Sequence, residues 1–334
     1  MGINRGIRIT TAAVVALAVA LGASGCTEAT SIYSDVVITS ELDGLARELG
    51  ELGGVTLTHT SSIQADYTYQ VAIDVQVDDP EPETLRTVIE RSVETLAGDV
   101  LARQRVYFHV GSGEQSLFST DSLAEGQTLD DVIEQDLDYW LALREASGAP
   151  LSLAYYGNDD PENSRTRAIS SSEPVDIAAL RSVVDPLGIP TQWAFPGLGS
   201  VGLPSVAEVE LFEKATEILP AASDIDYLDP GVSFALQHGD VYVYVRAAAL
   251  AEGAVATDSA TLPAAIDIAR LVAERASSIS FFDTSYTFES SVYFGVCEKP
   301  SEPRDSDRQL FTALRAAGIT LPAGSGPGYC NDGF

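Results

Sequence analysis

The sequence predicts an α+β fold, built as two-layer sandwiches of mainly antiparallel sheet with helices on one face. Residues 67–78 (YTYQVAIDVQVD) alternate between apolar and polar side chains, as in a half-buried strand. A proline-rich break follows, and apolar residues then recur at helical spacing. The same order occurs twice more, with helix openings at Pro82, Pro174 and Pro263 that are 92 and 89 residues apart.

The first third contains the clearest pattern. Before the alternating strand we expect a helix over 41–52 and a strand over 55–60. After it, a helix over 82–97 has acidic residues in its first turn, where they favour the helix dipole. Its apolar residues share one face: Leu85, Val88, Ile89, Val93 and Leu96. A further strand is expected over 105–110.

The other two thirds repeat this order with weaker signals. The second third predicts a helix, two strands, a helix and a strand at 129–144, 150–156, 165–171, 176–184 and 191–195. The last third predicts the same order at 205–219, 232–237, 241–247, 263–276 and 279–282. A final helix is expected over 305–317. Antiparallel neighbours combined with strand-helix-strand crossovers indicate ferredoxin-like units.

We therefore predict three divergent repeats. The expected divisions are a signal segment, a tether, repeat 1, repeat 2, repeat 3, and a tail with a helix, at 1–25, 26–35, 36–122, 123–200, 201–298 and 299–334. Residue identity between the repeats is low, so the repetition rests on periodicity and on the positions of the breaks. A coincidental similarity of three unrelated segments is the alternative.

The first 25 residues have the three parts of a secretory signal. Arg5 and Arg8 give a positive start, residues 11–21 are uncharged and mostly apolar, and residues 22–25 are small. The competing interpretation is a transmembrane helix. The uncharged run over 9–27 is rich in Ala, Gly, Ser and Thr, and its apolar part is shorter than the roughly 20 residues of a stable span.

The small residues end in Ala23-Ser24-Gly25-Cys26, which resembles the lipobox of bacterial lipoproteins. Ala23 stands where that family more often has leucine. The resemblance implies cleavage before Cys26, a diacylglycerol on its sulfur and an acylated amino terminus, with fatty acids such as palmitate. It also implies attachment to the outer, extracytoplasmic face of the cell membrane, which two acyl chains hold stably. An ordinary secreted protein with an incidental Cys26 is the alternative.

Two further compositional features bear on the source and the compartment. The scarcity of lysine, with only Lys214 and Lys299, resembles proteins of high-GC bacteria such as actinobacteria. With Cys26 lipidated, Cys297 and Cys330 remain, and an oxidising compartment favours a disulfide between them. A loop of that length is stabilised by about 3 to 4 kcal/mol on the chain-entropy model. Zinc is the alternative, but two cysteines beside so few histidines do not complete a site.

The charge of the chain excludes one class of partner. The formal net charge is −30, and without residues 1–25 it becomes −32, with 17 basic against 49 acidic residues. Phosphate backbones would be repelled, so nucleic acid is not expected as a partner. Anionic lipid headgroups would be repelled as well, so the acyl chains must anchor the protein without a basic patch.

No motif for catalysis, a cofactor or a metal is recognisable. The three histidines, His59, His109 and His238, fall in two strands and a hairpin turn, where they are expected to be solvated. Ser200 lacks the first glycine of a nucleophile elbow. The acidic residues at 158–163 lack the spacing of a calcium loop, and Asp224, Asp226 and Asp229 have no matching ligands. A carboxylate pair for hydrolysis stays open, because acids are abundant.

The most suggestive surface is aromatic. Trp193 and Phe195 lead into a glycine-rich loop, and Tyr155 and Tyr156 belong to the same repeat. Such residues can line a binding surface, although core packing is the alternative.

Together these features predict a non-enzymatic, lipid-anchored protein of the cell envelope that acts as a binding or assembly module. Its partners are expected to be the membrane and another envelope protein, and no cofactor is expected. A solute-binding lipoprotein of a transporter and a carboxylate-dependent envelope hydrolase are the alternatives. The paired antiparallel strands argue against the former, which usually has two doubly wound lobes.

Overall fold

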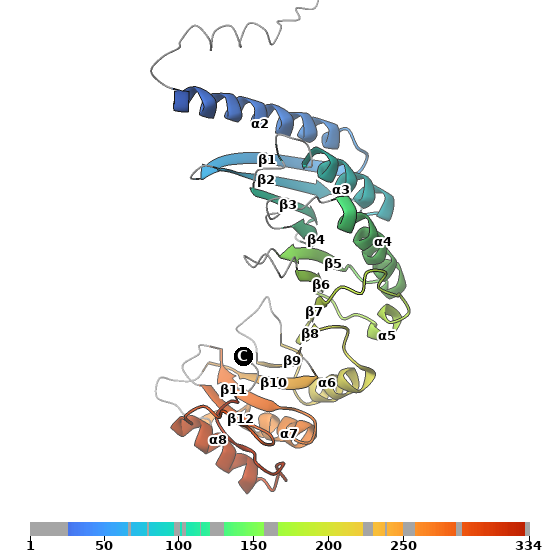
Figure 1. The fold of residues 1–334 in the computed structure, drawn as a ribbon. Coiled ribbons are helices and arrows are strands. Elements are labelled where there is room, and N and C mark those ends of the chain that lie inside the picture. Colours follow the sequence, from blue (N-terminus) through green and yellow to red (C-terminus); the bar gives the residue numbers. More distant parts are fainter. Residues whose placement is uncertain are drawn as a thin grey trace, which may run out of the picture. The chain divides into compact units, whose positions relative to one another are not determined.

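The computed structural model describes residues 26–65, 68–78, 80–96, 101, 105–113, 115–120, 130–156, 166–222, 230–237, 239–249, 258–284 and 289–330. They form two compact units. The first reaches Gln115, and the second contains Ser116–Thr120 and the chain from Asp131 onward. Helices and strands alternate along the whole described chain, which confirms the α+β class (Figure 1).

The first unit contains two helices and three strands within its described residues. These are α2 (Cys26–Gly50), β1 (Val55–Ala65), β2 (Thr68–Val77), α3 (Pro82–Leu96) and β3 (Arg105–Ser112). Strands β1 and β2 pair antiparallel, and β2 and β3 pair parallel across α3. Helix α2 packs on β1 and on α3. It does so through side chains three and four residues apart, Ile38, Leu42, Leu45 and Leu49, which are buried.

The second unit begins with two steps, each a crossover followed by a hairpin. Its first elements are β4 (Gln115–Thr120), α4 (Asp130–Ser147), β5 (Ser152–Tyr156), β6 (Thr166–Ser170), α5 (Ile177–Leu180), β7 (Thr191–Phe195) and β8 (Leu198–Val201). Antiparallel pairs β5–β6 and β7–β8 alternate with parallel pairs β4–β5 and β6–β7. Strand β8 was predicted as loop. Pro196 and Gly197 make the two-residue connection that returns the chain, and Gly197 has a φ of 71°.

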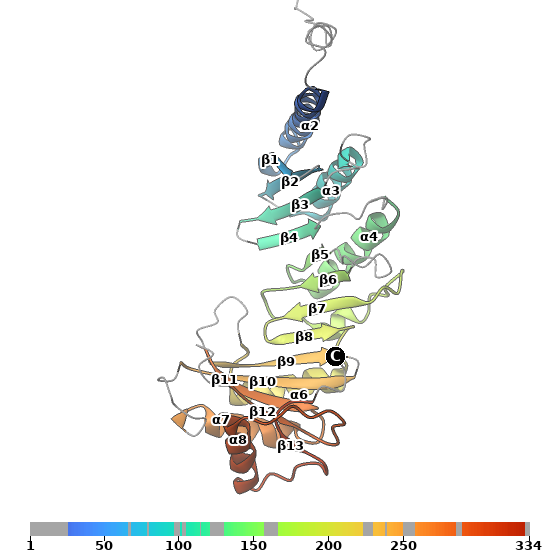
Figure 2. The same cartoon turned by 60° about the vertical axis from the view of Figure 1, so that its left-hand side comes forward.

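The rest of the second unit continues the same alternation. It contains α6 (Val206–Ile218), β9 (Gly231–Gln237), β10 (Asp240–Ala247), α7 (Leu262–Val272), β11 (Ser278–Asp283), β12 (Glu289–Tyr293), α8 (Asp305–Ala316) and β13 (Gly326–Pro327). Helix α6 contacts α7, and α7 contacts α8. Helices α6 and α7 lie together on one side of strands β9–β12 (Figure 2).

Within each unit the strands lie in the order in which they occur in the chain. The predicted ferredoxin-like order is therefore not the one observed, because that order inserts a strand between the two strands that a helix connects. Here each helix that connects two parallel strands, among the described strand pairs, connects strands that are neighbours in the sheet. The sheets are mixed, since antiparallel hairpins alternate with parallel crossovers.

The element order also shows a shorter module than the predicted repeat. From α2 to β12 a helix followed by two strands recurs, so the spacing of about 90 residues in the sequence spans two such modules. The segment predicted as a tether, 26–35, is helical as part of α2. From Asp131 onward, the described residues of 123–200 and 201–298, which were predicted as separate repeats, belong to the same unit.

Both units have a continuous apolar core between sheet and helices. In β10, Val241, Val243 and Val245 are buried, and in α7 the side chains of Ile268 and Val272 are buried. Among the residues described, no helix combines the length and the apolar character needed to cross a membrane.

Candidate functional site

A hollow of about 440 Å³ lies over strands β9–β12 in the second unit. Four tyrosines line it, Tyr242, Tyr244, Tyr293 and Tyr329, and we call it the tyrosine hollow. Four serines, two carboxylates and a disulfide provide most of the remaining lining. The volume falls within the range of small-molecule sites in proteins, about 300 to 1,000 Å³.

Strand register explains why these side chains share one face. In β10, buried valines alternate with Tyr242 and Tyr244, so the tyrosines face away from the core. Parallel pairing with β11 places Tyr242 opposite Ser278 and Tyr244 opposite Ser280. Each tyrosine therefore has a serine beside it on the floor of the hollow.

The floor continues onto β12. There Tyr293 lies opposite Ser278, and Ser291 lies opposite Ser280. The Oγ atoms of Ser280 and Ser291 are 2.9 Å apart, and either hydroxyl can donate. Because each hydroxyl has one donor and two acceptor positions, the floor can offer a ligand either a donor or an acceptor.

Both carboxylates of the hollow already accept hydrogen bonds. Asp240 Oδ1 accepts from Ser277 Oγ at 2.7 Å, and Glu289 Oε2 accepts from Arg304 Nη1 at 2.8 Å. The pKa of Arg304 is raised by its hydrogen bond to Asp307 and, against the opposing effect of burial, by its bond to Glu289. Arg304 thus shares its single positive charge between Glu289 and Asp307.

The phenols of β10 are held in their neutral form. Burial raises the pKa of Tyr242, and the charge of Asp240 raises it further. Burial also raises the pKa of Tyr244, with smaller contributions from Tyr242 and Glu289. Both hydroxyls can therefore donate hydrogen bonds at neutral pH.

The carboxyl-terminal tail forms one wall of the hollow. The structure forms the predicted disulfide, with 2.02 Å between the Sγ atoms of Cys297 and Cys330. Gly326 of β13 pairs with Tyr293. A Cβ atom at Gly326 would lie 2.4 Å from the hydroxyl of Tyr293, so a larger residue there would require the Tyr293 ring to shift.

A buried carboxylate fixes α8 against the same strand. Asp307 is 1% exposed, and its Oδ1 accepts from the backbone N–H of Ser291 at 2.7 Å. Its Oδ2 accepts from the backbone N–H of Arg304 at 2.7 Å. Asp307 thereby holds the start of α8 beside β12, and this position directs the Arg304 guanidinium toward Glu289.

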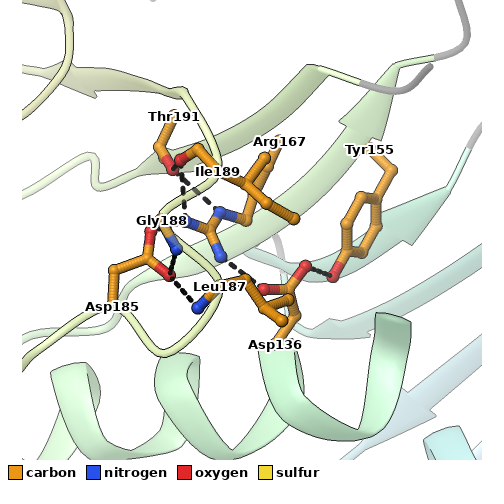
Figure 3. A network of polar contacts seen from close by, with 8 residues as sticks. All are labelled: Asp136, Tyr155, Arg167, Asp185, Leu187, Gly188, Ile189 and Thr191. Atoms are coloured by element: carbon orange, nitrogen blue, oxygen red, sulfur yellow. Dashed lines mark hydrogen bonds and ion pairs between the residues drawn. The ribbon is translucent and has the colours of Figure 1, made fainter. Parts of the chain in front are cut away.

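A second polar network lies in the core of the same unit and is shown in Figure 3. Arg167 of β6 is 1% exposed and forms ion pairs with Asp136 of α4 and with Asp185. Its Nε also donates to Thr191 Oγ1 at 2.8 Å. Asp136 accepts a further hydrogen bond from Tyr155 Oη at 2.8 Å.

This network joins one helix, three strands and the loop before β7. Burial alone would lower the pKa of Arg167, but Asp136 and Asp185 raise it above its ordinary value. Asp185 Oδ1 accepts from the backbone N–H groups of Leu187 and Gly188, at 2.9 and 3.0 Å. The buried charges are paired and hydrogen-bonded to one another. The network therefore has a structural role and is not a candidate ligand site.

The aromatic residues predicted to form a binding surface are buried where their side chains are described. Trp193, Phe195 and Tyr155 are 4%, 5% and 3% exposed and belong to the core. The alternation in β7 turns Thr191, Trp193 and Phe195 inward together. The side chain of Tyr156 lies outside the described residues. Core packing, the alternative, therefore accounts for these three aromatic residues.

The histidines occupy the places that the sequence suggested, where they are described. His59 is in β1, opposite Asp74. His109 is in β3, and its Nδ1 lies 3.0 Å from Asp74 Oδ1. The connection that contains His238 joins Gln237 to Asp240 as a two-residue hairpin, although His238 itself is outside the described residues.

Several other predicted sites cannot be placed. Residues 158–163, Asp224, Asp226 and Asp229 lie outside the described part of the chain, as do residues 1–25. Cys26 is the first residue of α2, and its side chain is not described. Among the described residues, no group of three or more acidic, histidine or cysteine side chains is arranged to hold a metal ion.

Sequence reasoning missed the tyrosine hollow as a site. The alternation of Tyr242 and Tyr244 with valines was visible, but their serine neighbours come from strands about 40 residues further along the chain. Comparison of the chain with protein-family models, with curated proteins and with solved structures finds no match. The fold and the site define an α+β protein with a hydroxyl-lined hollow in its second unit.

Proposed function

We propose that this protein is a non-enzymatic binding or assembly module of a bacterial cell envelope. It is held on the outer face of the membrane by a lipid on Cys26, and it binds its ligand in the tyrosine hollow. The observation that carries the binding role is the hollow itself, in which aromatic rings and hydroxyl groups from three strands and the tail face one volume. Aromatic residues with a few placed polar groups are characteristic of binding sites.

The chemistry of the hollow favours binding over catalysis. General acid-base catalysis needs a side chain that can exchange a proton with the substrate, and nucleophilic catalysis needs a base beside the nucleophile. Here Glu289 is bonded to Arg304 and Ser280 to Ser291. Ser277 has a carboxylate beside it, Asp240, but a serine nucleophile is usually activated through a histidine between the two groups. The described lining contains no histidine, lysine or arginine.

The location rests on the amino-terminal sequence. A positive start, an apolar run and the small residues before Cys26 support export and lipidation. The disulfide between Cys297 and Cys330 supports an oxidising compartment outside the cytoplasm.

Photocrosslinking in intact cells tests the binding role. A diazirine-bearing amino acid replaces Tyr244 in one variant and Val184 in a control, because Val184 is 83% exposed in the same unit but does not line the hollow. The proposal expects a covalent adduct, retained after denaturing purification, with the probe at Tyr244 and none with the probe at Val184. Equal labelling at both positions, or none at Tyr244, would overturn the assigned site.

Acyl labelling tests the anchor separately. Cys26→Ala should abolish incorporation of labelled fatty acid and should either release the protein from the membrane or leave it unprocessed. Cys26→Ala protein that still incorporates fatty acid would refute the lipid anchor without affecting the binding site.

A further inference from the structure

The charges in the tyrosine hollow argue most strongly against an anionic ligand. An anionic ligand needs a cation in the wall, and the described lining contains no lysine, arginine or histidine. The net charge of −30 also repels anions from a distance. A cationic ligand would meet Glu289, whose charge is partly offset because Glu289 shares Arg304 with Asp307. Asp240 is partly engaged by Ser277.

The hydroxyl groups favour a ligand that itself carries many hydroxyls. Eight of the fifteen lining residues are tyrosines or serines. Each hydroxyl can reverse its role between donor and acceptor, so the hollow can match a neutral ligand whose groups do the same. A buried hydroxyl that finds no partner is costly, and this cost disfavours a purely apolar ligand.

The aromatic rings of the hollow suit the apolar faces of a sugar ring. A pyranose or furanose ring has hydroxyls around its edge and C–H groups on its faces, and a tyrosine likewise combines an apolar ring with a polar tip. Tyr244 and Tyr329 are exposed to 36% and 46%, so part of each ring is accessible. Burial of a sugar face against such a ring is favourable in the same way as other apolar burial.

We propose that the tyrosine hollow binds a short segment of a neutral carbohydrate, with the tyrosine rings against the sugar faces and the serine and tyrosine hydroxyls bonded to the sugar hydroxyls. This assignment rests on the proposed binding function and specifies its ligand class. The volume of about 440 Å³ suits a segment of an oligosaccharide and not a whole polysaccharide chain. A neutral glycan of the cell envelope meets these requirements.

The test measures binding by the full chain, purified from membranes in a detergent that carries no sugar. The probes are neutral hexasaccharides of glucose in α and β linkage, mannose, galactose, arabinose and N-acetylglucosamine. Two charged comparators are the cationic glucosamine hexamer and the anionic galacturonate hexamer. Saturation-transfer NMR detects contact, and calorimetry gives the dissociation constant.

At least one neutral hexasaccharide should bind more tightly than both charged hexamers. Tyr244→Phe, which removes one hydroxyl, should weaken that binding by about 2- to 10-fold, and Tyr244→Ala should weaken it by more than about 10-fold. Tyr107→Phe is the matched control, because Tyr107 is a strand tyrosine of the first unit with 40% exposure, and it should leave binding unchanged.

Three results would overturn the assignment. They are no binding of any neutral probe at millimolar concentration, tighter binding of the glucosamine or galacturonate hexamer, or equal weakening by the Tyr244 and Tyr107 variants. If crosslinking at Tyr244 persists while every neutral sugar fails, the carbohydrate assignment falls and the binding function stands. If both fail, the hollow is not a binding site.

Discussion

Replacement of Arg167 by methionine removes the guanidinium from the buried network and keeps most of the volume of its apolar stem. Asp136, which is 0% exposed, would then keep only the hydrogen bond from Tyr155. Asp185 is less affected, because it also accepts from two backbone N–H groups and is partly exposed. Removal of one partner from a buried ion pair typically costs about 3 to 5 kcal/mol, and we expect a loss of that size.

Urea unfolding followed by tryptophan fluorescence measures this loss. Both tryptophans, Trp140 and Trp193, are buried in the second unit, so their fluorescence reports its unfolding. Arg308→Met is the control, because its ion pair with Asp305 is exposed at 54% and 92%, and such pairs contribute about 1 kcal/mol or less.

A double variant separates lost charge balance from lost packing. If the uncompensated carboxylate causes the loss, Asp136→Asn combined with Arg167→Met should recover about 1 kcal/mol or more, because no buried charge then remains at position 136. A single Arg167→Met variant that costs no more than the Arg308→Met control would refute the argument that this network supports the unit.

Four further predictions concern individual contacts. Replacing Cys297 and Cys330 together by serine should lower the free energy of unfolding by about 3 to 4 kcal/mol on the chain-entropy model; an unchanged urea midpoint would contradict this. Ser205→Ala removes the hydrogen bond that the Ser205 hydroxyl accepts from the backbone N–H of Glu208 at the start of α6 and should cost about 1 kcal/mol by the same assay, whereas a neutral effect would mean that the cap does not form. Gly197→Ala places a Cβ atom 2.9 Å from a backbone oxygen at a φ of 71°, so we expect a loss of about 1 to 3 kcal/mol, and wild-type stability would show that the turn is different. Burial raises the pKa of Tyr244 above 10.0. The stability that the neutral phenol contributes to the fold is therefore complete below pH 10 and is lost as pH rises through the pKa of the folded state. Ultraviolet titration of Tyr244→Phe should show one late-ionising phenol fewer than the wild type, and an unaltered late phase would contradict the assignment.

The sequence was most informative where the periodicity was local. Residues 68–77 form β2, as the alternation of apolar and polar residues predicted, and α8 covers 305–316 against an expected 305–317. Helix α2 begins 15 residues before its predicted start, because its first turns have no cap signal and little amphipathic pattern. Strand β8 was missed, since a four-residue strand that contains Gly199 is too short for a periodicity.

The site was less accessible to sequence reasoning, because it depends on pairing between distant segments. Trp193 and Phe195 drew attention as aromatics beside glycines, although their alternation with polar residues in β7 already indicated one buried face. Asp136 could have indicated a buried polar network, because it lies among buried residues of α4 on a face that should otherwise be apolar. Its partner Arg167 is 31 residues away in the sequence, and no local pattern connects them.

The short strand β13 has a consequence for how the protein behaves at high concentration. A sheet that adds strands in chain order ends in a free row of backbone groups, onto which a strand of another molecule could add. The tail occupies this row on β12 at Val292 and Tyr293, and Pro327 has no N–H to offer to an incoming strand. The bond between Cys297 and Cys330 keeps the tail near that edge. Residues 326–327 therefore cover the part of the β12 edge at which a strand of another molecule could otherwise pair.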